Sequence, residues 1–66
     1  MISLKDYWEE NVEIIAADGQ VFIGYAGDYF YPEDNENNIE SLAIETKDHK
    51  LIEFYPKDIK SIAIIE

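Results

Sequence analysis

The chain begins with a short helical pattern, and a long region of alternating apolar and polar residues follows. Ser3 is a suitable N-cap, and Leu4 and Trp8 are spaced so that both would lie on one face of a helix. We therefore expect a short helix over residues 3–10, ending before Asn11. A helix of this length needs tertiary contacts to persist.

From Val12 onward the pattern has a period of two, which is typical of β-strands. Asp18-Gly19 is a strong hairpin signal and separates the first two predicted strands. Gly24 and Gly27 lie inside the second strand and predict a sharp bend or a bulge there. The predicted strands cover residues 12–18, 20–30, 39–46, 51–55 and 59–65.

Polar segments connect these strands. Residues 31–38 predict an exposed loop, and residues 47–50 and 56–58 predict tight turns. In the third strand, Leu42 and Ile44 should face the core. Five short strands with tight connections predict one all-β domain over residues 1–66, a small bent antiparallel barrel or sandwich.

The fifth predicted strand is apolar on both faces. Ile62 and Ile64 lie on one face, and Ala63 and Ile65 lie on the other. Such a strand is usually covered on both sides, and an open apolar edge favours pairing with another chain. Because so short a chain has little material for a second cover, we expect a homo-oligomer.

Composition narrows the class of protein. Of the 66 residues, 47% are hydrophobic and nine are aromatic, which is too apolar for a disordered chain. There is no cysteine, so neither a disulfide nor a thiolate metal site can stabilise the fold. The net charge of −10 disfavours a nucleic-acid backbone, since such binding depends on lysine and arginine.

The sequence predicts neither a leader peptide nor a membrane span. Residues 1–6 lack a basic region followed by an apolar run. The longest apolar runs, residues 14–17 and 62–65, have four residues each, whereas a membrane helix needs about 20. We expect a cytoplasmic location and no membrane partner.

Two motifs resemble the Sm and Sm-like family, and the resemblance extends over nearly the whole chain. The first combines Val12-Glu13-Ile14, Asp18-Gly19 and Phe22-Ile23-Gly24, with Asp28 four residues later. The second, residues 55–62, is similar to the turn between the last two strands in the bacterial RNA chaperones of this family. The resemblance implies a five-stranded, bent antiparallel Sm-like or SH3-like barrel with a short N-terminal helix.

The resemblance also implies how subunits would associate. In this family the fourth strand of one subunit pairs with the fifth strand of the next. The corresponding interface residues here are Leu51, Phe54, Ser61, Ile62, Ala63, Ile64 and Ile65.

The chain departs from the family pattern where the family binds RNA. The short turn that normally offers an Asn to a uridine base is replaced by the acidic segment 31–38. The closing motif has Pro56-Lys57 in place of the Arg-Gly or Lys-His of family members. Any remaining RNA contacts would come from Asp28, Tyr29, Tyr55 and Lys57.

Other chemical candidates each have a simpler explanation. His49 lies between Asp48 and Lys50 in a predicted turn, so an exposed turn residue is favoured over a general base or metal ligand. Lys57 and Lys60 could contact a phosphate, but Asp58 lies between them, and ordinary surface charge is favoured.

The loop carries oxygen ligands at alternating positions, Asp34, Glu36 and Asn38, with Glu45 in twelfth place, as in a calcium loop. The sixth position is Ile39 instead of glycine, which favours a solvated acidic loop. In the same region, residues 29–31 are three aromatics that could stack on bases. Their acidic neighbours favour a role in the core instead.

These observations predict a non-catalytic, self-associating Sm-like module for protein interaction or scaffolding. We expect no catalytic residue, no metal and no cofactor. An RNA-binding Sm-like protein is the main alternative. An acidic decoy that mimics nucleic acid and binds a basic protein is a third hypothesis.

Overall fold

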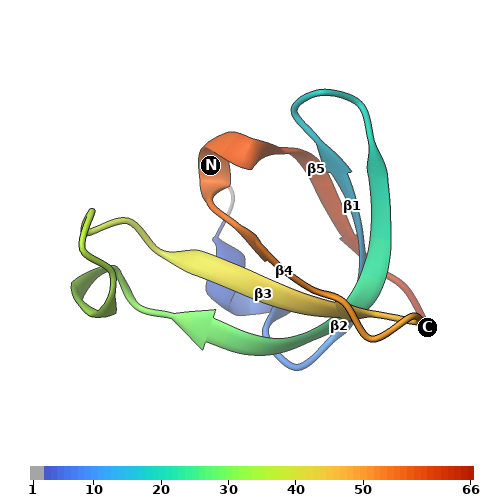
Figure 1. The fold of residues 1–66 in the computed structure, drawn as a ribbon, viewed down its shortest axis with the longest axis horizontal. Coiled ribbons are helices and arrows are strands. Elements are labelled where there is room, and N and C mark those ends of the chain that lie inside the picture. Colours follow the sequence, from blue (N-terminus) through green and yellow to red (C-terminus); the bar gives the residue numbers. More distant parts are fainter. Residues whose placement is uncertain (1–2) are drawn as a thin grey trace.

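The computed structural model describes residues 3–66, so Met1 and Ile2 of the predicted domain lie outside the described residues. The chain forms one antiparallel sheet with the strand order β4-β3-β2-β1-β5 (Figure 1). The strands are β1 (Asn11–Ala16), β2 (Val21–Phe30), β3 (Ser41–Thr46), β4 (Leu51–Phe54) and β5 (Ile59–Ile64). The predicted all-β class is confirmed. The sheet curls but does not close into a complete barrel, because β4 and β5 form its two edges.

Strand β2 bends at a bulge, as its glycines predict. Tyr25 pairs with Glu45 and Asp28 pairs with Ala43, so β2 advances three residues while β3 advances two. Ala26, inside the bulge, exchanges main-chain hydrogen bonds of 2.7 and 2.9 Å with the segment before β1. The bend lets β2 pair along both arms of the curved sheet (Figure 1).

The predicted N-terminal helix is shorter than expected. Only a 3-10 turn forms, η1 (Leu4–Tyr7), and the Ser3 side chain does not cap it. The chain leaves the helix because Glu9 and Glu10 hydrogen-bond to the main chain of Ala26. The prediction of a helix over residues 3–10 was therefore wrong in its extent, although Leu4 is fully buried as expected.

Side-chain and turn hydrogen bonds shorten two strands. β1 ends at Ala16 instead of residue 18, because the Gly19 N–H donates to the Ala16 carbonyl. β3 begins at Ser41 instead of residue 39, because the loop amides of Asn35 and Asn37 bind both main-chain groups of Ile39. Two further 3-10 turns, η2 (Pro32–Asp34) and η3 (Pro56–Asp58), lie within the predicted loops.

The core lies inside the curl of the sheet. Leu42 and Ile44 of β3 are fully buried, which confirms the predicted inner face. On β1 the alternating pattern places the even-numbered residues inside, and η1 contributes Leu4 beneath them. The buried apolar residues are Leu4, Val12, Ile14, Ala16, Ala26, Leu42, Ile44, Phe54 and Ile59.

Candidate interaction site

Strand β4 leaves its outer main-chain groups without a strand partner. β4 pairs only with β3 in the described sheet. The Thr46 N–H donates to the Lys50 carbonyl, and antiparallel bonding alternates along a strand. The N–H and C=O groups of Leu51 and Glu53 therefore point to the free side of β4.

Strand β5 forms the opposite edge in the same way. Its register with β1 is continued by the Ile65 N–H, which donates to the Asn11 carbonyl at 2.8 Å. By the same alternation, the main-chain groups of Ile62 and Ile64 point away from β1. The sheet thus has two free edges, joined in sequence by η3 (Figure 1).

The predicted interface residues lie along these two edges, and most of them are accessible. The side chain of Leu51 is 72% exposed and that of Ile64 is 49% exposed. Ser61 and Ala63 are exposed, whereas Ile62 and Ile65 are half-buried. Strand β5 therefore presents aliphatic surface on both faces, in agreement with the pattern of its sequence.

Phe54 is the exception among the predicted interface residues. Its side chain is buried, and its ring packs edge-to-face on Phe22 with 5.4 Å between centroids. In the alternation of β4, Phe54 shares the inner face with Ile52, because the two are separated by one residue. The ring of Phe54 therefore belongs to the core, and a neighbouring chain along β4 would pair with the main chain of Leu51 and Glu53 instead.

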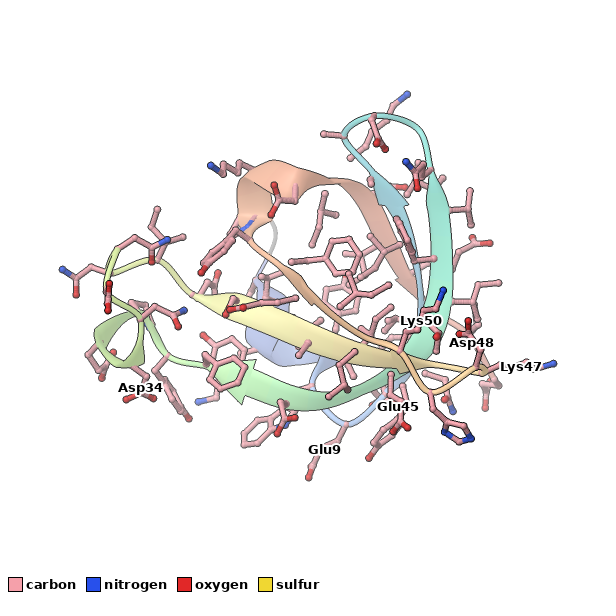
Figure 2. The ribbon with its side chains drawn as sticks, in the orientation of Figure 1. Glu9, Asp34, Glu45, Lys47, Asp48 and Lys50 are labelled. Carbon is pink, nitrogen blue, oxygen red and sulfur yellow. The ribbon has the colours of Figure 1, made fainter. Side chains whose placement is uncertain are left out.

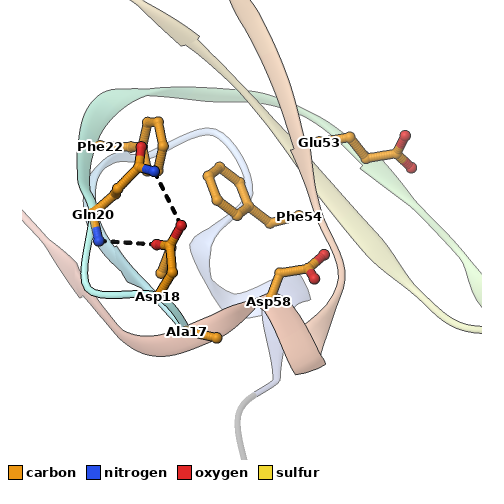
Figure 3. Close-up of a pocket in the computed structure, with 8 residues that line it drawn as sticks. Ala17, Asp18, Gln20, Phe22, Glu53, Phe54 and Asp58 are labelled. Atoms are coloured by element: carbon orange, nitrogen blue, oxygen red, sulfur yellow. Dashed lines mark hydrogen bonds between the residues drawn. The ribbon is translucent and has the colours of Figure 1, made fainter.

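A cavity of about 350 Å³ opens between the β1–β2 hairpin, β4 and η3 (Figure 3). Phe22 and Phe54 form its apolar wall, and three carboxylates surround it, those of Asp18, Glu53 and Asp58. No local sequence pattern predicts this cavity, because its residues come from three segments that are separate in the chain.

The three carboxylates of this cavity are occupied by structural hydrogen bonds. Asp18 accepts bonds of 3.0 Å from both the N–H and the side-chain amide of Gln20 (Figure 3). Asp58 accepts from the Tyr55 N–H at 3.0 Å. Glu53 accepts from the buried Ser41 hydroxyl at 2.6 Å. These bonds hold the hairpin, the η3 turn and the loop in place, so the carboxylates serve the fold.

Tyr29, one of the predicted RNA contacts, belongs to an aromatic cluster. Its ring lies 5.9 Å from that of Trp8 and 5.0 Å from that of Tyr31, measured between centroids. Its hydroxyl donates to Glu40 at 2.7 Å. Burial, with a further contribution from Glu40, raises the pKa of Tyr29 to about 12. Trp8 completes this cluster instead of Phe30, so residues 29–31 do not form a three-ring platform.

The four predicted RNA contacts do not converge on one cavity. Tyr55 lines a second cavity of about 440 Å³ between the 31–40 loop and β4, but Asp28, Tyr29 and Lys57 do not line it. The other lining residues are acids and amides, namely Asp34, Asn35, Glu36, Asn37 and Glu53. Such a wall repels phosphate.

The β3–β4 turn holds His49 as an exposed residue. His49 has a left-handed main chain, with φ of 65°. Its Nδ1 lies 3.0 Å from a carboxylate oxygen of Glu45, and its side chain is open to solvent. Beside it, a hydrogen bond from the Thr46 hydroxyl is the main cause that lowers the pKa of Asp48.

The residues weighed as calcium ligands and set aside in favour of a solvated loop are dispersed. Asp34 lies in the loop at one end of the molecule, whereas Glu45 lies near the β3–β4 turn at the other end (Figure 2). Across residues 3–66, no three histidine or acidic side chains gather closely enough to hold a metal ion.

In the part of the chain that the structure describes, no helix has the length and apolar character needed to cross a membrane. Comparison with protein-family models, with curated proteins and with solved structures finds no match for this chain.

Proposed function

We propose that this chain is a non-catalytic Sm-like module that self-associates through the free edges of β4 and β5. One observation carries the proposal: the sheet has two open edges, and β5 exposes aliphatic side chains on both faces. An open apolar edge is a template for pairing with another strand. Pairing β4 of one copy with β5 of the next is head-to-tail, and it generates a ring or a filament.

Several features of the fold support the Sm-like part of the proposal. The β1–β2 hairpin carries Asp18-Gly19, the long β2 bends at a bulge, and a 3-10 turn joins β4 directly to β5. A short helical turn precedes β1. All four features agree with the resemblance that the sequence motifs suggest.

Net charge sets the conditions under which this association should be measured. Each copy carries a charge of −10, so copies repel one another at low salt. Physiological salt screens exposed charges beyond about 8 Å. Association through main-chain hydrogen bonds and aliphatic contacts should therefore strengthen as salt is added.

Light scattering coupled to size exclusion, over a wide range of protein and salt concentrations, tests the proposal. We expect a mass that is a multiple of the 7.7 kDa chain and that rises with salt. A strict monomer at high protein concentration and physiological salt would overturn self-association. Circular dichroism of the same samples separates assembly from aggregation of unfolded chain.

The acidic wall of the second cavity weighs against the RNA-binding alternative. Asp34, Glu36 and Glu53 line it, and among its lining residues there is no lysine. We expect no retention of uridine-rich or adenine-rich RNA in filter binding at low salt, where electrostatic attraction is strongest. If the filter retained one of these RNAs in preference to the other, RNA binding would be restored as the function.

A further inference from the structure

The outer face of the sheet carries an apolar stripe that nothing in the described chain covers. Alternate residues of β2 point outward, and the side chain of the central one, Ile23, is 52% exposed. Register places one further apolar residue, Ile15 of β1, beside Val21 on the same face. We call this surface the outer stripe; it consists of Val21, Ile23 and Tyr25 of β2 and Ile15 of β1.

The outer stripe is contoured. Ile23 lines two shallow cavities of about 300 and 390 Å³. One cavity is bounded by Tyr25 and Ile65, and the other by Val21 and Thr46. Hollows on either side of one exposed aliphatic side chain can receive the anchoring side chains of a partner.

The position of the stripe determines how a partner can bind. β2 is a central strand whose two sides pair with β1 and β3, so this face offers side chains and no free strand edge. A partner must pack as a second layer, as helices pack on sheets. From Val21 to Tyr25 the row extends about 13 Å, and two helical turns cover about 11 Å.

Carboxylates adjoin the stripe and define the charge of the partner. Glu13 lies directly opposite both Ile23 and Ala63, and Glu45 lies opposite Tyr25. One cation, Lys47, lines both cavities beside Ile23, together with Glu45 and Glu66 in one and Asp48 in the other (Figure 2). A second copy stacked face to face would bring these carboxylates against another molecule of charge −10.

We infer that the outer stripe binds the apolar face of a cationic amphipathic helix from another protein. Glu13 and Glu45 meet lysine or arginine side chains at the margins of that face. The inference goes beyond self-association, because edge pairing extends the sheet in its own plane and leaves this face uncovered. In an assembly, each subunit would present one such site.

Nuclear magnetic resonance titration of the full chain tests the inference. The probe is a synthetic amphipathic helix of leucine and lysine, compared with its leucine–glutamate counterpart and with a lysine–serine peptide of equal charge. We expect only the leucine–lysine peptide to shift the amide signals of the stripe residues Ile15, Val21, Ile23 and Tyr25. Shifts confined to other faces, or equal shifts with the lysine–serine peptide, would overturn the inference.

Matched variants distinguish peptide binding at the outer stripe from nonspecific binding to exposed apolar side chains. Ile23→Ser should weaken binding of the leucine–lysine peptide about tenfold, as loss of an anchoring side chain does. Ile39→Ser is the control, because Ile39 is 44% exposed but lies in the 31–40 loop. An equal loss from both variants would contradict the site. Val21→Ser provides a second stripe variant if Ile23→Ser does not give a folded spectrum.

A second pair of variants distinguishes the effect of a charge beside the stripe from the effect of the net charge of the chain. Glu13→Gln and Glu36→Gln each remove one negative charge, and only Glu13 adjoins the stripe. We expect Glu13→Gln to weaken peptide binding about threefold at low salt and Glu36→Gln to leave it unchanged. Equal effects would contradict the role of Glu13. Shifts of the stripe signals with protein concentration alone would identify a second copy as the occupant and overturn the inference.

Discussion

Gly24 of β2 packs directly against the main chain of Glu45 on β3. A Cβ at Gly24 would lie 2.5 Å from the Glu45 carbonyl oxygen and 2.9 Å from its carbonyl carbon. Both contacts are with main chain, which the β2–β3 ladder holds in place. Gly24 pairs with Thr46, one position before the last pair that precedes the bulge, so the absence of a side chain at Gly24 lets the two strands stay paired as the sheet curves.

Gly24→Ala should therefore destabilise the fold by about 1–3 kcal/mol, the usual cost of overpacking. Gly27→Ala is the matched control, because a Cβ there would meet only the Tyr25 ring at an ordinary 3.5 Å. Urea unfolding followed by tryptophan fluorescence measures both. Equal losses for the two variants would show that the Glu45 contact does not determine the requirement for glycine.

Ser41 connects the 31–40 loop to the sheet. Its side chain is fully buried; the hydroxyl donates to Glu53 and accepts from the Asn35 side-chain amide at 3.1 Å. Ser41→Ala removes both bonds and should cost about 1–2 kcal/mol of unfolding free energy. Ser61→Ala, at an exposed position, should change it by less than about 0.5 kcal/mol. A loss at Ser61 as large as that at Ser41 would refute this role.

The apolar–polar alternation was sufficient to predict the class, the five strands and much of the core. In β3 the residues next to Leu42 and Ile44 are smaller or polar. Only one orientation of the strand therefore buries its large apolar side chains, and Leu42 and Ile44 face inward. In β4 the pattern is ambiguous, since Leu51 and Ile52 are both apolar. The family resemblance, and not this pattern, places Phe54 at the interface, whereas its side chain is buried in the core.

The contacts that the sequence did not predict join segments far apart in the chain. The Trp8 indole N–H donates to the Gly27 carbonyl at 3.3 Å, 19 residues away. Glu9 and Glu10 leave the predicted helix to bond Ala26. No local pattern encodes such partners, because they depend on where the bulge of β2 falls. The end of η1 could therefore be located only with the sheet in place.

Tyr29 predicts how stability depends on alkaline pH. Because burial and Glu40 raise its pKa to about 12, the folded state keeps the phenol protonated after the unfolded chain, near pH 10, has lost the proton. This contribution to stability is complete below pH 10 and disappears as the pH rises through about 12. Ultraviolet titration of the folded protein should show a tyrosine that ionises late.

Two variants identify the late-ionising group. Tyr29→Phe should remove the late step from the titration. Glu40→Gln should lower the pKa of Tyr29 without restoring its ordinary value, since burial is the larger cause. A late step that survives in Tyr29→Phe would assign it to another tyrosine and contradict the prediction.

The free edge of β4 can be tested with one proline. The N–H of Leu51 points to the free side, so Leu51→Pro removes a hydrogen-bond donor that only another chain could use. Leu51 is the first residue of β4, a position where proline is tolerated. We expect the variant to stay folded and to scatter light as the 7.7 kDa monomer. Leu51→Ala keeps the N–H and should weaken assembly less, which separates hydrogen bonding from side-chain burial.

The adjacent residue supplies the control for that proline. The N–H of Ile52 points toward Ile44 of β3, so Ile52→Pro removes a bond within the sheet and should cost at least about 1 kcal/mol of unfolding free energy. The two proline variants should thus differ in what they lose: Leu51→Pro should lose assembly, and Ile52→Pro should lose stability. If Leu51→Pro assembles like the unmodified chain, the edge of β4 is not where copies meet, because pairing along that edge would use the Leu51 N–H that the variant lacks.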